Sequence, residues 1–278
     1  MSMPTSVART MSLLSDEALA ESLHLGGPIL GLVKRLLAIA QMNELNRKCA
    51  AETGWDFAAA VLRSLGVRLI VKDDAFAALT PDDPMVIISN HPFGLLDGLI
   101  LTKLLGDRIR SFKFISNYLL SGIESLKDHF IFVNSFDDAG DERSNVANVR
   151  AILRLARSHS SIVIFPAGDV SFFRLRKLRV EDRDWDLAST KLIKKLNLPI
   201  LPVYIEGRNS IAYQIMNGMH HRLGLLRLPR ELLNKRGHSV QVVTGKPFRL
   251  TPGDMSSDIP SLSAMLKNRV YGLRDQAR

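Results

Sequence analysis

The sequence is poor in cysteine and has no long uncharged apolar run. Its single cysteine, Cys49, excludes an intramolecular disulfide and a zinc site with several cysteine ligands, and is typical of the reducing cytoplasm. The best candidate for a membrane span, residues 26–42, is interrupted by Lys34 and Arg35, so it lacks the roughly 18 uncharged residues that a transmembrane helix needs. The N-terminal residues also lack the basic-then-apolar order of a secretory signal. We therefore expect a chain that does not span a membrane.

Acidic and aromatic residues are also comparatively few. Lys and Arg number 37 against 28 Asp and Glu, a net charge of +9 that favours either nucleic acid or an anionic membrane surface as partner. Aromatic residues make up 6% of the chain and leave few stacking platforms for single strands, and no nucleic-acid-binding signature is present. We therefore expect contact with an anionic membrane and no nucleic acid. A non-catalytic basic protein that binds lipid or nucleic acid is the alternative.

Short apolar runs alternate with longer helical patterns from residue 66 onward. The runs are rich in β-branched and aromatic residues and predict strands at 67–71, 85–89, 112–116, 130–134, 161–165, 200–205 and 240–243. Helical patterns fall at 95–105, 143–158, 186–196 and 261–275. This alternation predicts an α/β domain, residues 66–278, with a mostly parallel sheet flanked by helices. Residues 1–65 are expected to form a helical N-terminal segment.

Basic residues interleave with large apolar residues in three segments. Within the N-terminal segment, residues 28–42 have apolar residues at helical spacing with Lys34 and Arg35 on the other side. Such a helix either covers a protein core, which is the commoner case, or lies in a bilayer interface. Residues 172–180 and 222–237 have a similar composition, and for 222–237 core burial and membrane contact are equally good interpretations.

Polar residues cluster where three of the predicted strands end. Asn90 and His91 follow the strand at 85–89, Gly168 and Asp169 follow 161–165, and residues 207–210 follow 200–205. Ligands of open α/β sheets bind beyond the carboxyl ends of the strands, so these clusters are expected to share one site.

His91 and Asp97 are the candidate acid–base pair. Pro92 disfavours helical dihedrals at His91 and Gly94 permits a tight turn, so the imidazole is expected to project from a loop. The helix predicted from residue 95 places Asp97 in its first turn, where its carboxylate can fold back towards the ring. A carboxylate that accepts a hydrogen bond from one ring nitrogen leaves the other nitrogen free as a base. On spacing alone, a helix cap at Asp97 and a packed strand-end histidine is at least as good an interpretation.

Three blocks of sequence resemble the lysophospholipid acyltransferase superfamily, which includes the bacterial 1-acylglycerol-3-phosphate acyltransferases. "NHPFGLLDG" (90–98) resembles its histidine–aspartate block, "IVIFPAGDVS" (162–171) its Phe-Pro-Glu-Gly block, and "LPILPVYIEGRNS" (198–210) its later, proline-bearing strand. Their order and spacing match over roughly residues 66–250, and three blocks in order are far more specific than one. Within the superfamily, the residues of these blocks are most similar to those of the branch labelled hemolysin-like or ornithine-lipid acyltransferase-like.

The resemblance implies an O-acyltransferase that moves a fatty acyl group from a thioester, acyl-ACP or acyl-CoA, to the hydroxyl of a lysolipid. His91 would be the general base and Asp97 its orienting partner, with no bound cofactor and no metal. Backbone N–H groups around Gly94 or Gly168 are candidates to stabilise the oxyanion. The residues expected to contact substrate are Asn90, Phe93, Gly94, Phe165, Pro166, Gly168, Asp169, Ser171, Arg174 and Asn209.

Two departures from the superfamily pattern bear on which acceptor the enzyme would use. Five residues rather than the common four separate the histidine from the aspartate, and the usual glutamate is replaced by Ala167. In relatives that glutamate and a nearby arginine help hold a phosphate. The acceptor is therefore either lysophosphatidate-like, with positive charge from Arg174, Arg176 and Lys177, or a lyso-aminolipid of the ornithine-lipid type whose amine would meet Asp169.

A hydrolase that uses the same His–Asp pair is a further alternative. Neither a Gly-x-Ser-x-Gly elbow nor another nucleophile context is present, so acyl transfer is favoured over hydrolysis. We expect a cytoplasmic enzyme of membrane lipid biosynthesis, peripherally associated with the inner face of the cell membrane.

Overall fold

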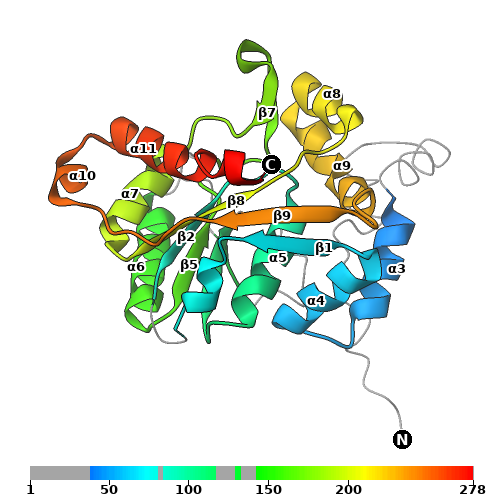
Figure 1. The fold of residues 1–278 in the computed structure, drawn as a ribbon, viewed down its shortest axis with the longest axis horizontal. Coiled ribbons are helices and arrows are strands. Elements are labelled where there is room, and N and C mark those ends of the chain that lie inside the picture. Colours follow the sequence, from blue (N-terminus) through cyan, green and yellow to red (C-terminus); the bar gives the residue numbers. More distant parts are fainter. Residues whose placement is uncertain (1–37, 81–83, 117–128, 133–141, 278) are drawn as a thin grey trace, which may run out of the picture.

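A seven-stranded sheet forms the centre of the computed structural model, which describes residues 38–80, 84–116, 129–132 and 142–277 (Figure 1). The strand order is β1-β9-β8-β2-β5-β3-β4, and all neighbours run parallel except β8 and β9. The strands are β1 (Arg68–Lys72), β2 (Val86–Ser89), β3 (Phe112–Ser116), β4 (Phe130–Phe132), β5 (Ser161–Ile164), β8 (Ile200–Ile205) and β9 (Ser239–Thr244). The predicted mostly parallel sheet is confirmed, and each predicted strand is present.

Helices cover both faces of this sheet. They are α3 (Ile39–Cys49), α4 (Gly54–Leu65), α5 (Leu95–Gly106), α6 (Glu142–Arg157), α7 (Leu187–Leu196), α8 (Ile211–Met219), α9 (His221–Leu233), α10 (Pro252–Ser256) and α11 (Ile259–Tyr271). Successive side chains of a strand point to opposite faces, and β2 shows the consequence. Ile87 belongs to the core beneath α3, α4, α5 and α9, while Val86 and Ile88 belong to the core beneath α6, α7 and α11. All four predicted helices are present as α5, α6, α7 and α11.

The described part of the N-terminal segment packs into the body of the protein. Met42 of α3 and Phe57 and Leu62 of α4 are buried in the same core as Ile87 of β2. The domain boundary after residue 65 stays a prediction, and most of the amphipathic helix predicted at 28–42 lies outside the described residues. No helix in the described ranges is long and apolar enough to cross a bilayer.

A β-hairpin and the helix α8 lie on the same side of the molecule, and neither was predicted from the sequence. The hairpin consists of β6 (Phe172–Arg174), the short 3-10 helix η5 (Leu175–Lys177) and β7 (Arg179–Glu181), and β6 pairs antiparallel with β7. It projects from the body beside α8 (Figure 1). Both elements begin where a loop of the candidate site ends.

Candidate active site

The carboxyl end of β2 carries His91 at the middle of the sheet, between β5 and β8. The residue before it, Asn90, donates from Nδ2 to the carbonyl of Ile205 at 2.8 Å and accepts at Oδ1 from the Ile205 N–H at 2.7 Å. This side-chain amide continues the ladder between β2 and β8 beyond the end of β2. It therefore fixes where the chain leaves the sheet and where His91 begins.

The His91 ring and the Asp97 carboxylate lie together. Nδ1 of His91 is 2.9 Å from Oδ2 of Asp97, in a short but imperfectly aligned contact of the kind common in catalytic pairs before substrate binds. The same oxygen accepts hydrogen bonds from the N–H groups of Phe93 and Gly94 at 2.9 Å each, which caps α5. Gly94 adopts a φ of 88°, which allows this tight loop. One carboxylate thus holds both the imidazole and the loop that carries it.

The Phe-Pro-Ala-Gly block after β5 forms one wall beside the histidine. The ring of Phe165 stacks on His91 with centroids 4.1 Å apart, which covers one face of the imidazole. Further along the block, the Ser171 N–H donates to the His91 carbonyl at 2.8 Å. Pro166 accepts at its carbonyl from the N–H of Asp186, which holds the block against the start of α7. The predicted convergence of the first two strand-end clusters is confirmed.

The loop after β8 meets the histidine loop through Phe93. Nδ2 of Asn209 donates to the Phe93 carbonyl at 3.3 Å. The Phe93 ring is buried against the backbone of Gly207, whose φ of 145° lies in the region that favours glycine. Lys235, two residues after the end of α9, lies over the same Phe93 ring, with its Nζ 4.7 Å from the ring centroid. All three predicted clusters therefore meet at the loop from His91 to Gly94.

The contact between Gly207 and Phe93 makes a first prediction. A methyl group at residue 207 would overlap the ring of Phe93, so Gly207→Ala is expected to lower the free energy of unfolding by about 2 kcal/mol. Gly218→Ala is the control, because this helical glycine has no atom near its Cβ position, and it should stabilise the protein by about 0.5 kcal/mol. Denaturant titration measures both values. Equal stability of the two variants would contradict the packing described here.

A buried carboxylate that the sequence did not single out supports the histidine loop. Asp182 accepts hydrogen bonds from the Ser171 hydroxyl at 2.5 Å, from the Trp185 indole at 3.0 Å and from the His91 N–H at 3.2 Å. Because two of these donors belong to the loops that form the site, Asp182 ties those loops together. It lies in a mostly acidic run, residues 181–186, which carries no motif or periodic signal.

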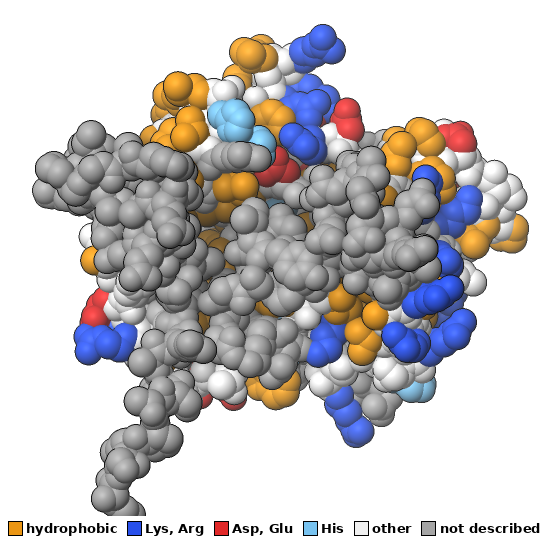
Figure 2. All heavy atoms as spheres, turned by 180° about the vertical axis from the view of Figure 1, so that it is seen from behind, with side chains coloured by type: hydrophobic (Ala, Val, Ile, Leu, Met, Phe, Trp, Pro, Cys, Tyr) orange, Lys and Arg blue, Asp and Glu red, His pale blue; other side chains and the backbone are white. Residues whose placement is uncertain are grey.

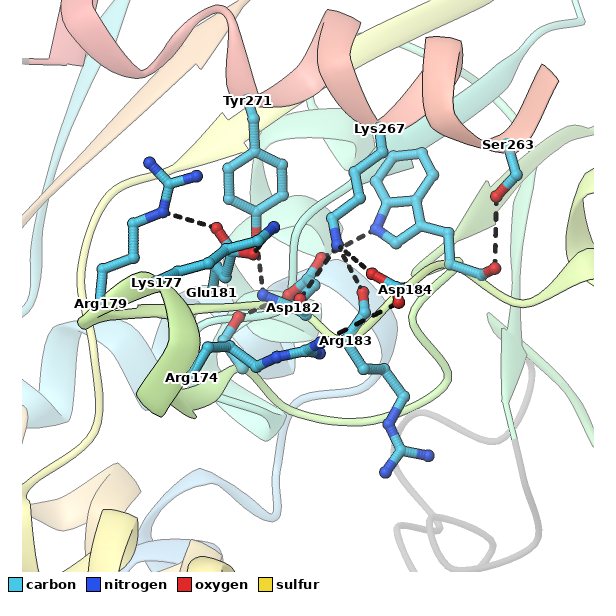
Figure 3. Close-up of polar contacts among 12 residues, drawn as sticks. Arg174, Lys177, Arg179, Glu181, Asp182, Arg183, Asp184, Ser263, Lys267 and Tyr271 are labelled. Atoms are coloured by element: carbon cyan, nitrogen blue, oxygen red, sulfur yellow. Dashed lines mark hydrogen bonds and ion pairs between the residues drawn. The ribbon is translucent and has the colours of Figure 1, made fainter. Parts of the chain in front are cut away.

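Helix α11 encloses Asp182 from the other side (Figure 3). The Tyr271 hydroxyl lies 2.7 Å from the Asp182 amide nitrogen and accepts its hydrogen bond, and Lys267 donates to the Asp182 carbonyl at 3.1 Å. Burial raises the pKa of the Asp182 carboxyl, and the donors Ser171, Trp185 and His91 only partly offset that rise. The group is therefore a fixed element of the scaffold rather than a contact for substrate.

A second buried carboxylate, Glu231 of α9, holds the start of α8. It accepts hydrogen bonds from the N–H of Ser210 at 2.8 Å and from its hydroxyl at 2.6 Å, and it pairs with Arg227 at 3.0 Å. On the inner face of α8, the Tyr213 hydroxyl is buried and has no hydrogen-bond partner among the described residues. Burial raises the pKa of Tyr213, as do the charges of Asp169, Glu231 and Asp97. The start of α8 is thus fixed close to the acidic groups of the site.

Asp169 and Arg174 lie in charged pairs at the edge of the site. Oδ1 of Asp169 accepts from the Val170 N–H, and Oδ2 lies 3.5 Å from the Arg183 guanidinium. Arg174 lies 4.0 Å from Asp184, a contact drawn in Figure 3. Asp169 therefore faces a cation of the protein itself, which the sequence did not predict.

The two backbone donors predicted for the oxyanion are already engaged. The Gly94 N–H donates to Asp97, and the Gly168 N–H donates to the Phe165 carbonyl at 3.0 Å in a tight turn. These two amides are therefore not free to bind an oxyanion in this structure, and the expectation that backbone N–H groups around them do so stays a prediction. The substrate contacts predicted for Asn90, Phe93, Ser171 and the other residues of the three blocks stay predictions. No cluster of three potential metal ligands occurs among the described residues.

Comparisons with known proteins show the family to which this chain belongs. Residues 12–277 match the model of a family described as acyltransferase. The chain belongs to this acyltransferase family. It is 25% identical over 252 residues to a lyso-glycine lipid O-acyltransferase of Phocaeicola vulgatus, covering 87% of each chain. It is also 24% identical to a lyso-glycine lipid O-acyltransferase of Bacteroides thetaiotaomicron, covering 88% of this chain and 89% of that one.

The fold of this acyltransferase is similar to that of the 1-acyl-sn-glycerophosphate (LPA) acyltransferase PlsC from Thermotoga maritima. The TM-score is 0.50 at 16% identity, and the match covers 85% of this chain and 80% of the other. The predicted membership of the lysophospholipid acyltransferase superfamily is confirmed, as is the prediction that the protein is an O-acyltransferase.

Proposed function

We propose that this acyltransferase moves a fatty acyl group from an acyl thioester to the hydroxyl of a lyso-amino-acid lipid, with His91 as general base. The observation that carries the proposal is the 2.9 Å contact between Nδ1 of His91 and Oδ2 of Asp97 at the end of the central strand. The imidazole keeps 18% of its surface exposed while the carboxylate is fully buried. Substrate can therefore reach the ring but not its acidic partner.

The proposed reaction has two proton transfers and no covalent enzyme intermediate. Nε2 of His91 takes the proton of the acceptor hydroxyl as its oxygen attacks the thioester carbonyl. The negative charge of Asp97 stabilises the imidazolium that forms. Collapse of the tetrahedral intermediate breaks the carbon–sulfur bond, and the departing thiolate takes the proton back from Nε2. The products are the diacylated lipid and a free thiol, on acyl carrier protein or on coenzyme A.

The charges at the site edge favour an amino-acid headgroup as acceptor. Ala167, which stands where the superfamily has a glutamate, is 3% exposed and offers no polar group to a phosphate. Asp169 and Arg183 present one charge of each sign, 3.5 Å apart. Arg183 can bind the carboxylate of an amino-acid headgroup, and Asp169 can bind a side-chain amine where the amino acid is ornithine. The names of the two lyso-glycine lipid relatives support the same class of acceptor.

Two other ion pairs, made by cations of the hairpin, disfavour the lysophosphatidate alternative. Of the three cations predicted to hold a phosphate, Arg174 faces Asp184 and Lys177 pairs with Glu181 (Figure 3). A phosphate would have to compete with a carboxylate at both positions.

A panel of acceptors tests this proposal. With acyl-ACP or acyl-CoA as donor, kcat/KM is expected to be about tenfold or more higher for lyso-glycine and lyso-ornithine lipids than for lysophosphatidate, which corresponds to about 1.4 kcal/mol. Product formation is followed by mass spectrometry. Arg183→Ala should raise KM for both amino-acid lipids, whereas Asp169→Asn should raise it for lyso-ornithine lipid alone. Arg249 is an exposed arginine at the opposite edge of the sheet, so Arg249→Ala is the control and should leave KM unchanged for both lipids.

Two results would contradict the proposal. A preference for lysophosphatidate that Arg183→Ala leaves intact would overturn the acceptor assignment. Release of free thiol at the same rate with and without acceptor would identify a hydrolase instead.

A further inference from the structure

The side of the molecule that carries β7 and α8 exposes apolar residues on two adjoining elements. On α8, Ile211, Ile215 and Met219 are 79%, 60% and 74% exposed, and their spacing of four places them in one stripe along the helix. At the hairpin tip, Leu175 and Leu178 are 79% and 78% exposed. We call these five residues the apolar ridge. Figure 2 shows hydrophobic side chains gathered at the top of the molecule, where Figure 1 places β7 and α8.

The two elements that carry the apolar ridge pack against each other. The Phe173 N–H of β6 donates to Oε1 of Gln214 on α8 at 2.8 Å. The nine residues of α8 include no charged side chain, and the face opposite the stripe buries Tyr213. A helix with an apolar outer face and no charge is unusual on a soluble protein, since contiguous exposed apolar patches usually mark a binding surface.

Cations of the hairpin flank the ridge. Residues 172–181 contain four Lys or Arg side chains and one carboxylate, Glu181, which gives a net charge of +3. Glu181 is buried and pairs with Lys177 and Arg179, while Arg176 is exposed between Leu175 and Leu178. Protruding leucines with cations beside them match the boundary between acyl chains and anionic headgroups.

Leucines of α9, which the sequence offered as membrane contacts, are placed differently. Leu232 lies in the core, and Leu228 packs within van der Waals reach of Gly94 in the histidine loop. The core interpretation therefore holds for Leu232, and α9 supports the site from inside. The most exposed large apolar residues among those described belong to α8 and the hairpin.

We propose that the apolar ridge and Arg176 dock this enzyme on an anionic bilayer, with the loop that carries the partly exposed His91 next to the lipid. The inference rests on the proposed lysolipid acceptor and names the surface from which that acceptor is taken. The hairpin starts directly after Ser171, which bonds to the His91 carbonyl, and α8 starts two residues after Asn209, which bonds to the Phe93 carbonyl. Docking at the ridge therefore places the histidine loop next to the membrane, where a lysolipid needs only a short transfer out of the bilayer.

Vesicle flotation of the full chain, without turnover, tests the docking surface. The variant Ile211→Ser/Ile215→Ser/Met219→Ser is expected to bind about tenfold more weakly to both phosphatidylcholine vesicles and phosphatidylcholine–phosphatidylglycerol vesicles. Arg176→Gln should weaken binding about fivefold to the anionic vesicles only. Ile70→Ser, a partly exposed apolar residue on the edge strand β1, is the matched control and should bind like the wild type.

Activity separates this inference from the proposed function. The triple variant should lose transfer to lysolipid presented in vesicles and keep transfer to a short-chain acceptor dissolved as monomers. Absence of transfer to the soluble acceptor in the wild type would count against the proposed function and leave the binding result unaffected.

Three outcomes would overturn the docking surface. The first is wild-type vesicle binding by the triple variant. The second is a change from dimer to monomer in that variant with vesicle binding intact, which would make the ridge an interface between copies. The third is a raised KM for acyl-ACP alone, which would make it a carrier-protein surface.

Discussion

Replacing His91 with alanine is expected to lower kcat/KM for acyl transfer by about 10²–10⁴-fold, because the acceptor hydroxyl loses its general base. The fold should survive this change. The side chain is partly exposed and belongs to neither core cluster, so the main loss is the stacking contact with Phe165, about 1 kcal/mol. Transfer of labelled acyl groups and thermal unfolding measure the two effects. Activity within a factor of ten of the wild type would remove His91 from the mechanism.

Two further variants sharpen this result. Asp97→Asn keeps an oxygen that can accept from the Phe93 and Gly94 amides but removes the negative charge beside the ring, so kcat should fall about 10²-fold with the helix cap largely retained. His238→Ala, which removes an exposed imidazole before β9, should leave transfer unchanged. If Asp97→Asn were fully active, the Asp97 carboxylate would serve only to cap α5 and would have no role in acyl transfer.

Replacing Asp182 with alanine is expected to cost about 3 kcal/mol of the free energy of unfolding. The change leaves the Ser171 hydroxyl, the Trp185 indole and the His91 N–H without their buried acceptor. Activity should fall as well, since the His91 loop loses its link to the block after β5. Denaturant titration gives the stability, and Asp184→Ala is the control, because Asp184 is 88% exposed and should contribute within about 0.5 kcal/mol. Similar losses in the two variants would contradict the role assigned to Asp182.

The raised pKa of Asp182 adds a dependence on pH. Burial raises this pKa above the value of the unfolded chain, so the stability from this group is fully present below about pH 4 and is lost as the pH rises through the folded-state pKa. Asp182→Asn has no such titration. The free energy of unfolding of the wild type minus that of Asp182→Asn should therefore decrease from pH 4 to pH 8. A constant difference would show that burial does not raise the pKa of the Asp182 carboxyl in the folded protein.

The sheet and the meeting of the three blocks could be predicted because both depend on local patterns. The central strands β2, β5 and β8 are fully buried apolar runs, and His91 and Asn209 lie in the loops that follow β2 and β8. Parallel neighbours end at the same edge of a sheet, so residues far apart in sequence had to converge. Asp97 was ambiguous from its spacing, and the structure shows why, since capping and contact with the imidazole use the same oxygen.

The parts that could not be predicted have no local pattern. Strands β6 and β7 have three residues each, too few to show alternation. Helix α8 carries apolar residues on its exposed side, so its sequence lacks the usual polar face. Asp182 is one of four acidic residues in the run 181–186, and only the folded chain shows that Glu181 and Asp182 are the buried ones. The Gly94 and Gly168 amides are used by a helix cap and a tight turn, local contacts whose geometry the residue types alone do not specify.

The strand order separates the loops that surround His91 from those that only connect helices to strands. At the edge opposite His91, the connections 107–111, 158–160 and 197–199 join helices to strands and contribute none of the groups around the imidazole. New chain ends or an inserted reporter are therefore best tolerated there. A break between the blocks at 90–98 and 162–171 yields halves that are each inactive, and turnover should return only when both halves rejoin around β2, which suits the enzyme to a split-protein assay.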